Sequence, residues 1–357
     1  MYDFTLICWE LKRRTPMGIY GGYPCIGYPQ ADGLVPAFQK VGARIQTLEF
    51  CDYATLGLTK EQDKKEPFRK LGMDIESKNV LIEWDGITSH RDFGNIWKWG
   101  KKVYTIPHNG SNVSGNLNDP VEEKRLRKEI TEQSHKVIFA FDMERAFWKE
   151  FECNKYLVMN PPTRMGKVTD KQEARRILGI DTKYALIAWG NYEGKDNQNI
   201  LPWLDEWRDT ALLFVGSGCP EGMKDRAVVF GDSSKYLYFT KPGISDLDAD
   251  IWFSASDLCS YLRSVGGSST PTYILGQGKG IVAKNLPLYQ EYERLGGVIT
   301  GETDLDVKRI TRELLLDEEK RKILEQKSYE YAKKNSYEKY AIRLGKLMGF
   351  DYKEKES

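Results

Sequence analysis

The sequence predicts an α/β protein of two domains, each built on a doubly wound parallel sheet. Its 357 residues are enough for two domains of ordinary size. Short, apolar, β-prone runs alternate with stretches of helical length, which is the pattern of repeated strand-helix units. The alternation is interrupted at Asn160-Pro161-Pro162, which can continue neither a helix nor a strand, and then restarts. We therefore predict one domain over residues 1–162 and a second over residues 163–335.

The composition is that of a soluble globular protein. Hydrophobic residues make up 40% and charged residues 29%, and the net charge of +1 gives no general reason to expect nucleic-acid or membrane binding. The six cysteines are scattered without a CxxC pair, which indicates reduced thiols and no metal site. Residues 9–14 (WELKRR) interrupt the first apolar run, so no signal peptide is predicted, and no apolar stretch approaches the length of a membrane span. These features predict a cytoplasmic protein.

The first domain opens with a strand, a long loop, a helix and a second strand. Residues 3–9 (DFTLICW) are apolar and β-prone, residues 31–41 have a helical pattern, and residues 43–50 return as a strand. The loop between the first strand and the helix is rich in Gly, Pro and Tyr and contains Gly21 and Gly22. Ligands bind doubly wound sheets at the carboxyl ends of their strands, so this loop is either a binding loop or a flexible surface loop.

Two further apolar runs, residues 79–84 and 102–106, predict buried strands that lead into polar positions. The first run is followed directly by Asp85, and the second by Pro107 and His108. A histidine just past the carboxyl end of a parallel strand points into the binding cleft and titrates near neutrality. His108 is therefore a candidate functional residue, with a simple turn residue as the alternative.

The remaining elements of the first domain have no predicted role in a site. The charged residues 59–70 predict a solvated helix, and we place His90 and His135 in helices. The other predicted elements are helices over 122–134 and 143–151 and strands over 136–141 and 156–159.

The second domain restarts with a helix over residues 171–178 and a strand over residues 184–189, which leads into residues 190–195 (GNYEGK). Further strands are predicted over 211–216 and 227–230, and residues 234–241 form either a strand or an insertion.

Gly216 and Gly218 after a strand suggest a dinucleotide site. However, Glu221 stands where the third glycine of that motif belongs, and Pro220 is unsuited to a helix start on a pyrophosphate. We therefore do not expect NAD binding.

The stretch over residues 249–285 carries the strongest chemical signal. It predicts an apolar strand at 251–254, a polar loop at 265–271 (VGGSSTP), a short helix, and a second strand at 280–283. Backbone N–H groups at a helix start are unpaired, the helix dipole is positive there, and glycine lets a phosphate come close. The loop is therefore a candidate anion site, and the alternative is an ordinary turn-rich connection.

The chain closes with helical patterns. Residues 305–315 and 318–335 are rich in Glu and Lys at supportive spacing, residues 336–350 are amphipathic, and residues 351–357 read as a frayed tail.

The order of these motifs resembles the retaining GT-B glycosyltransferases of family four. Ala249-Asp250 fall where that family has an ADVFVLPS-type strand, and residues 276–285 (GQGKGIVAKN) fall at its ACGTPVVASN-type strand. Residues 286–289 and 296–300 match a short helix followed by a GG-containing strand. Residues 190–195 resemble the family's GRL…KG element, whose Arg and Lys neutralise the donor diphosphate. The resemblance is specific from about residue 171 to residue 350.

The sequence also departs from the family pattern. On this alignment Val265 and Tyr273 replace the two Glu residues that flank the loop, and Asn191 replaces the Arg. About half a dozen extra residues follow Ser256. Tyr273, at the ribose position, would stack or donate one hydrogen bond, which weakens or shifts nucleotide binding.

The resemblance implies a GT-B fold: two Rossmann-like domains facing each other across a cleft, with a C-terminal helix over 336–350 crossing back to the first. It implies sugar transfer with retention from a nucleotide-diphosphate sugar, a UDP or GDP sugar, without a metal or cofactor. It also implies that His108 is catalytic and positions or deprotonates the acceptor. The implied donor-binding residues are Gly190, Asn191, Lys195, Gly266, Gly267, Ser268, Ser269, Thr270 and Tyr273, and the acceptor-side residues are Gly21, Gly22 and Asp85.

Two alternatives remain open at this point. A GT-B enzyme acting on modified DNA bases would use the Lys12-Arg13-Arg14 cluster beside the Tyr-rich loop, although the neutral total charge argues against it. A non-catalytic sugar-nucleotide-binding protein would explain the missing Glu pair. The acceptor (glycan, lipid or DNA base) and the oligomeric state are not indicated, and an NAD oxidoreductase or a sugar-nucleotide epimerase is disfavoured.

Overall fold

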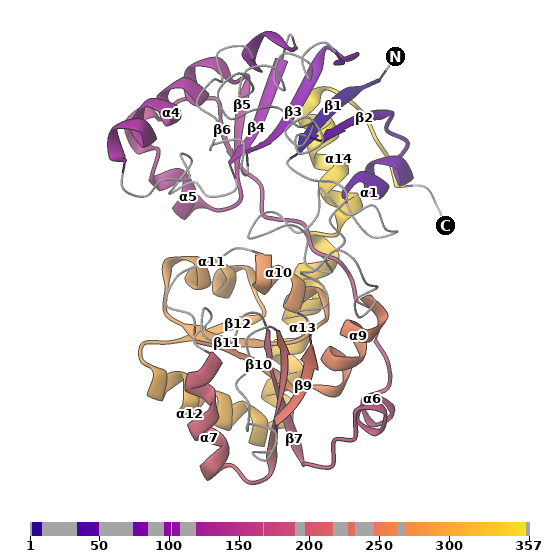
Figure 1. Ribbon diagram of the computed structural model, residues 1–357, viewed down its shortest axis with the longest axis vertical. Coiled ribbons are helices and arrows are strands. Elements are labelled where there is room, and N and C mark those ends of the chain that lie inside the picture. The colour runs from indigo at the N-terminus through magenta and orange to yellow at the C-terminus, as the bar shows by residue number, and fades with distance from the viewer. Residues whose placement is uncertain are drawn as a thin grey trace, which may run out of the picture. The chain divides into compact units, whose positions relative to one another are not determined.

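The computed structural model describes residues 2–8, 34–49, 74–84, 96–100, 102–107, 119–166, 168–189, 197–216, 228–232, 246–262 and 269–354 (Figure 1). These residues form two compact units. The first unit contains the described residues up to Pro162 together with those from Tyr337 onward, and the second contains Thr163–Ser336. Among the described residues, the chain therefore passes between the units twice, after Pro162 and after Ser336. The predictions on residues 59–70, on 234–241, on His90 and on the Lys12-Arg13-Arg14 cluster fall outside the described residues.

The first unit is built on a six-stranded sheet in the order β2-β1-β3-β4-β5-β6, in which every pair is parallel. Its strands are β1 (Phe4–Cys8), β2 (Ile45–Glu49), β3 (Asn79–Trp84), β4 (Lys102–Pro107), β5 (Lys136–Phe139) and β6 (Tyr156–Val158). Its helices are α1 (Leu34–Lys40), α4 (Pro120–Gln133), α5 (Asp142–Ala146) and α14 (Tyr337–Met348), with short 3-10 turns at Ile96–Lys98 and Lys149–Phe151.

Local sequence explains these elements well. The strands bury apolar side chains such as Leu6, Ile7 and Ile82 completely, as expected for parallel strands covered on both faces. Helix α4 begins at Asp119, whose carboxylate accepts a hydrogen bond from the backbone N–H of Glu122 at 3.0 Å. A proline follows at the first helical position, where a missing N–H costs nothing.

The second unit repeats this architecture with a six-stranded parallel sheet in the order β12-β11-β10-β7-β8-β9. Its strands are β7 (Tyr184–Trp189), β8 (Thr210–Gly216), β9 (Val228–Asp232), β10 (Leu258–Tyr261), β11 (Ile281–Lys284) and β12 (Val298–Gly301). Its helices are α6 (Lys171–Leu178), α7 (Leu201–Glu206), α9 (Asp246–Ala255), α10 (Ser269–Gly276), α11 (Pro287–Leu295), α12 (Asp304–Leu316) and α13 (Glu318–Lys334), with a 3-10 turn at Asn197–Ile200. Two parallel sheets flanked by helices confirm the predicted α/β class.

The predicted strand over residues 251–254 is wrong, because these residues belong to helix α9. A short apolar run fits a buried helix as well as a strand. In α9 the run buries Trp252 and Phe253, and the strand follows as β10. In the structure Ser256-Asp257, not Ala249-Asp250, immediately precede a strand. The placement of Ala249-Asp250 at the start of a strand is therefore wrong.

Two smaller predictions are also corrected. His135 lies between α4 and β5 rather than in a helix, and its backbone N–H donates to the Val103 carbonyl at 2.7 Å. The C-terminal residues are not frayed up to residue 354, because Tyr352 is buried and its hydroxyl donates to Asp3 at 3.0 Å. The Tyr352 ring stacks on Phe350 and meets the edge of Phe38. These contacts join residues far apart in sequence, so no local pattern announces them.

Candidate functional site

The strand order of the second sheet marks one position as the natural ligand site. From β7 the chain moves outward to β8 and β9, and from β10 it moves outward in the opposite direction to β11 and β12. The order therefore reverses between β7 and β10, which are neighbours. In open α/β sheets, ligands bind at such a switch point, outside the carboxyl ends of the strands.

The two segments with the predicted donor-binding residues begin at this position. Leu258 of β10 pairs with Leu186 of β7, and Cys259 pairs with Ile187, so the two strands leave the same edge of the sheet side by side. The segment after β7 holds Gly190, Asn191 and Lys195, and the segment after β10 holds Gly266, Gly267 and Ser268; all six lie outside the described residues. The described strands thus bring together the starting points of the two segments.

Helix α10 starts at this edge and carries the last predicted phosphate-binding residues. Ser269 and Thr270 are its first two residues, and Pro271 follows within the first turn, where a proline is tolerated. An eight-residue α-helix presents unpaired N–H groups and a partial positive charge at this end. An anion held by the preceding loop would therefore meet a favourable backbone field.

Tyr273 lies one turn further along α10, and its side chain belongs to the interior of the second unit. It is 2% exposed, and its ring meets the ring of Phe253 in α9 edge to face, with centroids 5.5 Å apart. The contact with Phe253 of α9 therefore restricts the position of the Tyr273 ring. Its predicted contact with the ribose stays a prediction.

The acceptor-side candidates follow strands at the equivalent position of the first sheet. There the order reverses between β1 and β3, with β4 next to β3. Gly21 and Gly22 lie in the segment after β1, Asp85 directly follows β3, and His108 directly follows β4; all four are outside the described residues. Trp84 and Pro107, the residues just before Asp85 and His108, are paired across β3 and β4.

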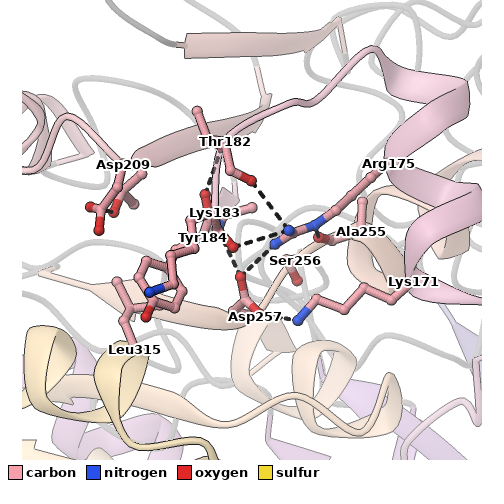
Figure 2. A network of polar contacts seen from close by, with 12 residues as sticks. Lys171, Arg175, Thr182, Lys183, Tyr184, Asp209, Ala255, Ser256, Asp257 and Leu315 are labelled. Carbon is pink, nitrogen blue, oxygen red and sulfur yellow. Dashed lines mark hydrogen bonds and ion pairs between the residues drawn. The ribbon is translucent and has the colours of Figure 1, made fainter.

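The opposite, amino edge of the second sheet holds a buried charge network that sequence reasoning missed (Figure 2). Asp257, which immediately precedes β10, is 1% exposed and accepts hydrogen bonds from Arg175 at 2.6 Å and from the Ala185 backbone N–H at 2.7 Å. It also accepts a hydrogen bond from Lys171, and Arg321 lies 3.9 Å away. One carboxylate therefore joins α6, α13, β7 and β10.

The cations of this network also satisfy backbone carbonyls. Arg175 donates to the carbonyls of Ala255, Thr182 and Lys183, at 3.1, 3.3 and 3.1 Å (Figure 2). Lys279 donates to the Ser256 carbonyl at 2.9 Å, and burial lowers the pKa of its ammonium group. The contacts of these side chains are structural, and they fix the edge of the sheet that lies away from the switch point.

Asp250, which sequence alignment placed at the start of a strand, has a structural role instead. Both of its oxygens accept hydrogen bonds from the guanidinium group of Arg164, at 2.7 and 2.9 Å, and both side chains are buried. The pair ties α9 to the segment that enters the second unit.

The described residues contain neither a candidate metal site nor a membrane-spanning helix. Within these ranges no three His, Cys, Asp or Glu side chains are grouped as metal ligands. None of the described helices is long and apolar enough to cross a bilayer.

The sequence matches no protein-family model and no curated protein. Its fold, however, is shared with solved structures along nearly its whole length. It is similar to sucrose-phosphate synthase from Thermosynechococcus elongatus, with 12% identity, a TM-score of 0.67, and 96% of this chain and 97% of that chain covered. It is also similar to Anabaena HepE in complex with UDP and glucose, with 9% identity, a TM-score of 0.67, and 98% and 100% covered.

A third similar structure is a putative UDP-N-acetylglucosamine 2-epimerase from Listeria monocytogenes, with 12% identity, a TM-score of 0.57, and 99% of each chain covered. At these identities the likeness establishes the fold and leaves the family open. The structural neighbours are GT-B glycosyltransferases in the main, and the observed pair of parallel, helix-flanked sheets agrees with them. The chain therefore has the GT-B fold.

Proposed function

We propose that the protein is a glycosyltransferase that moves a sugar from a UDP or GDP donor to an acceptor hydroxyl. The observation that carries the proposal is the switch point of the second sheet. There β7 and β10 lead into the two segments whose residue types suit a diphosphate. The shared fold supports the proposal, because one similar structure, HepE, is a complex with UDP and glucose.

In this proposal the second unit stabilises the leaving diphosphate. Lys195 neutralises one phosphate charge, and the backbone N–H groups over residues 266–270 donate to phosphate oxygens at the start of α10. A hydrogen bond between charged partners is worth about 1.5–3 kcal/mol. Preorganised donors of this kind stabilise the charge that develops as the bond between the sugar and the diphosphate breaks.

Tyr273 distinguishes this site from a family-four site. A Glu accepts hydrogen bonds from both ribose hydroxyls, whereas a Tyr offers one hydroxyl on a rigid ring. Because that ring packs against Phe253, we expect it to move little. We therefore propose that the nucleotide binds in a shifted position or with lower affinity than in a family-four site.

The acceptor is proposed to bind against the first unit. Gly21 and Gly22 would face it, and Asp85 and His108 follow two adjacent, in-register strands. His108 would position the acceptor hydroxyl or accept its proton as the hydroxyl oxygen attacks the sugar carbon. We further propose that the transfer retains the anomeric configuration and needs no metal. NMR of the product anomer and assays with a chelator test these two points.

Binding and turnover of nucleotide sugars test the proposed function. UDP-sugars and GDP-sugars are screened by thermal shift, and a true ligand at a hundredfold excess over its Kd stabilises the protein by about 2.7 kcal/mol. Sugar transfer or slow hydrolysis is then followed with the best ligand. Lys195→Ala should lose most of both signals, and Lys333→Ala, at an exposed position of the same unit, should keep them. No stabilisation by any nucleotide or nucleotide sugar would refute the proposal.

A second candidate function follows from the likeness to the putative 2-epimerase. The same panel includes UDP-N-acetylglucosamine without an acceptor. Inversion at C2 of its sugar, seen by NMR, would favour an epimerase over a glycosyltransferase.

A further inference from the structure

Thr163 is the first residue of the second unit, and its backbone joins the two places where the chain passes between units. Its N–H donates to the carbonyl of Asn335 at 2.9 Å, and Thr163 and Ser336 form an isolated parallel bridge. Ser336 is the last residue of this unit before the chain returns to the first. The entering and leaving segments are therefore hydrogen-bonded to each other.

The side chain of Thr163 points the other way, to helix α10. Its hydroxyl is buried, with 1% of the residue exposed, and donates to the carbonyl of Thr272 at 2.5 Å. The contact continues along the entering segment, where the N–H of Gly166 donates to the carbonyl of Gly276 at 2.9 Å. A Cβ atom on Gly276 would overlap the carbonyl oxygen of Arg164. Helix α10 thus lies directly on the backbone of the entering segment.

Helix α13, which leads to the leaving segment, holds the end of α10 from another direction. The Ser328 hydroxyl donates to the carbonyl of Lys279 at 3.0 Å, just after α10. A Cβ atom on Gly280 would overlap the side chain of Leu324, so the Leu324 side chain packs directly on the backbone at Gly280. The Asn335 side chain then donates to the Tyr331 carbonyl at 3.0 Å and closes α13. Both chain passages are therefore mechanically connected to α10.

We propose that Thr163 is a positioning residue that couples nucleotide binding at the start of α10 to the two chain passages. This inference rests on the proposed function, because it needs a diphosphate at that helix end. Thr272 lies one turn into the eight-residue helix, so a displacement of α10 toward a bound phosphate moves its carbonyl as part of one rigid body. The Thr163 hydroxyl passes that displacement to the hydrogen bond with Asn335.

The coupling is reciprocal. A ligand that stabilises the hydrogen bond between Thr163 and Asn335 must itself bind more strongly when that hydrogen bond is formed. Thr163→Val keeps the shape of the side chain and removes the hydroxyl, whereas Thr163→Ser keeps the hydroxyl. Calorimetry with UDP as the probe should show a Kd about three- to tenfold higher for Thr163→Val, because the variant loses the coupling between this hydrogen bond and UDP binding. Thr163→Ser should restore binding to near the wild-type Kd.

A matched control separates coupling from general destabilisation. Thr131 in the first unit is also buried, and its hydroxyl bonds to the Arg127 carbonyl at 2.8 Å and to the Tyr156 hydroxyl at 2.5 Å. Thr131→Val should lower the melting temperature as Thr163→Val does, while its Kd for UDP stays that of the wild type. Equal Kd values for UDP in the wild type and Thr163→Val would overturn the inference.

Hydrogen exchange followed by mass spectrometry distinguishes coupling from a purely structural role of Thr163, because a structural role predicts no change in exchange when UDP binds. In the wild type, saturating UDP should slow exchange in peptides that contain Thr163 and Asn335–Ser336, and in Thr163→Val this response should be lost at the same fractional saturation. The wild-type experiment decides the matter even if the valine variant does not fold. UDP binding without slower exchange at the passages overturns the inference alone, and no binding of UDP or GDP overturns the proposed function and the inference together.

Discussion

The two edges of the second sheet differ in what their charged and polar groups do. At the amino edge, Asp257 is surrounded by Arg175, Lys171 and Arg321, and the two arginines also donate to backbone carbonyls. At the carboxyl edge, the sequence places glycines, serines and Lys195 just past the strand ends. The difference teaches that the two edges of one small sheet have different tasks. The buried ionic groups at the amino edge stabilise the fold, and the residue types at the carboxyl edge are suited to a ligand.

Loss of the Asp257 carboxylate should have the largest effect on stability. Asp257→Ala leaves the buried Arg175 without its charged partner, so the free energy of unfolding should fall by about 3–5 kcal/mol in a denaturant titration. Asp209→Ala is the control on the same sheet, because Asp209 pairs with Arg312 at 2.8 Å at a partly exposed position. It should cost at most about 1 kcal/mol. Equal losses in the two variants would show that burial does not set the importance of the network.

A side chain on Gly276 should have an intermediate effect. Gly276→Ala forces α10 away from the Arg164 carbonyl, and overpacking of this kind costs about 1–3 kcal/mol. Because α10 starts at the carboxyl edge, UDP binding should weaken together with stability. Gly278→Ala is the matched change: it meets open space and strains only a backbone with a φ of 68°, so stability should fall by about 1 kcal/mol with the Kd for UDP unchanged. If Gly276→Ala bound UDP with wild-type affinity, α10 would not contribute to the UDP site.

Tyr352 provides a reference outside the second unit, with a pH dependence of known sign. Burial alone would raise the pKa of Asp3, but hydrogen bonds from the backbone N–H of Arg44 and from Tyr352 outweigh it and hold this pKa below its ordinary value. A depressed pKa contributes stability above the unfolded value of about 3.9, and that contribution is lost as the pH falls through the folded pKa. Tyr352→Phe should therefore cost about 1 kcal/mol at pH 7.

The cost of Tyr352→Phe should shrink on acidification below about pH 4, as measured by urea unfolding at several pH values. The Kd for UDP should stay that of the wild type at pH 7. If the loss of unfolding free energy in Tyr352→Phe stayed constant down to pH 2, the hydrogen bond to Asp3 would not be the source of the stability that Tyr352 contributes.

The smallest stability effect is expected at the carboxyl edge. Lys195→Ala should change the free energy of unfolding by no more than about 0.5 kcal/mol in the absence of ligand, as for a surface substitution. The stabilisation gained by adding UDP should fall sharply in the same variant. A large loss of stability without ligand would remove the distinction between the two edges.

Much of the fold follows from local sequence, and much of the amino edge does not. The predicted bounds of β3, α6 and β7 agree with the structure because apolar runs and caps define them locally. Helix α6, for example, starts at the Asp170 cap and ends at Gly179, which has a φ of 68°. By contrast, Asp257 finds its partners Lys171 and Arg175 more than 80 positions earlier in the chain.

The candidate site was predictable in part for the same reason. Motif spacing indicates which residue types follow β7 and β10, whereas only the strand order shows that the two segments start side by side. The alignment error at Ala249-Asp250 has a physical cause, since the apolar run of α9 satisfies burial as a helix and Asp250 is occupied by Arg164. A short apolar run in the sequence does not distinguish a buried helix from a buried strand.

The return of α14 to the first unit has a consequence for the order in which the protein is made. The described residues of the second unit all lie within 163–336, whereas the first unit needs α14 against α1 and Tyr352 against Asp3. During synthesis, all residues of the second unit emerge before the first unit has its last helix. The half of the protein that begins the chain is therefore the half completed last, because its final helix is synthesised only after residues 163–336.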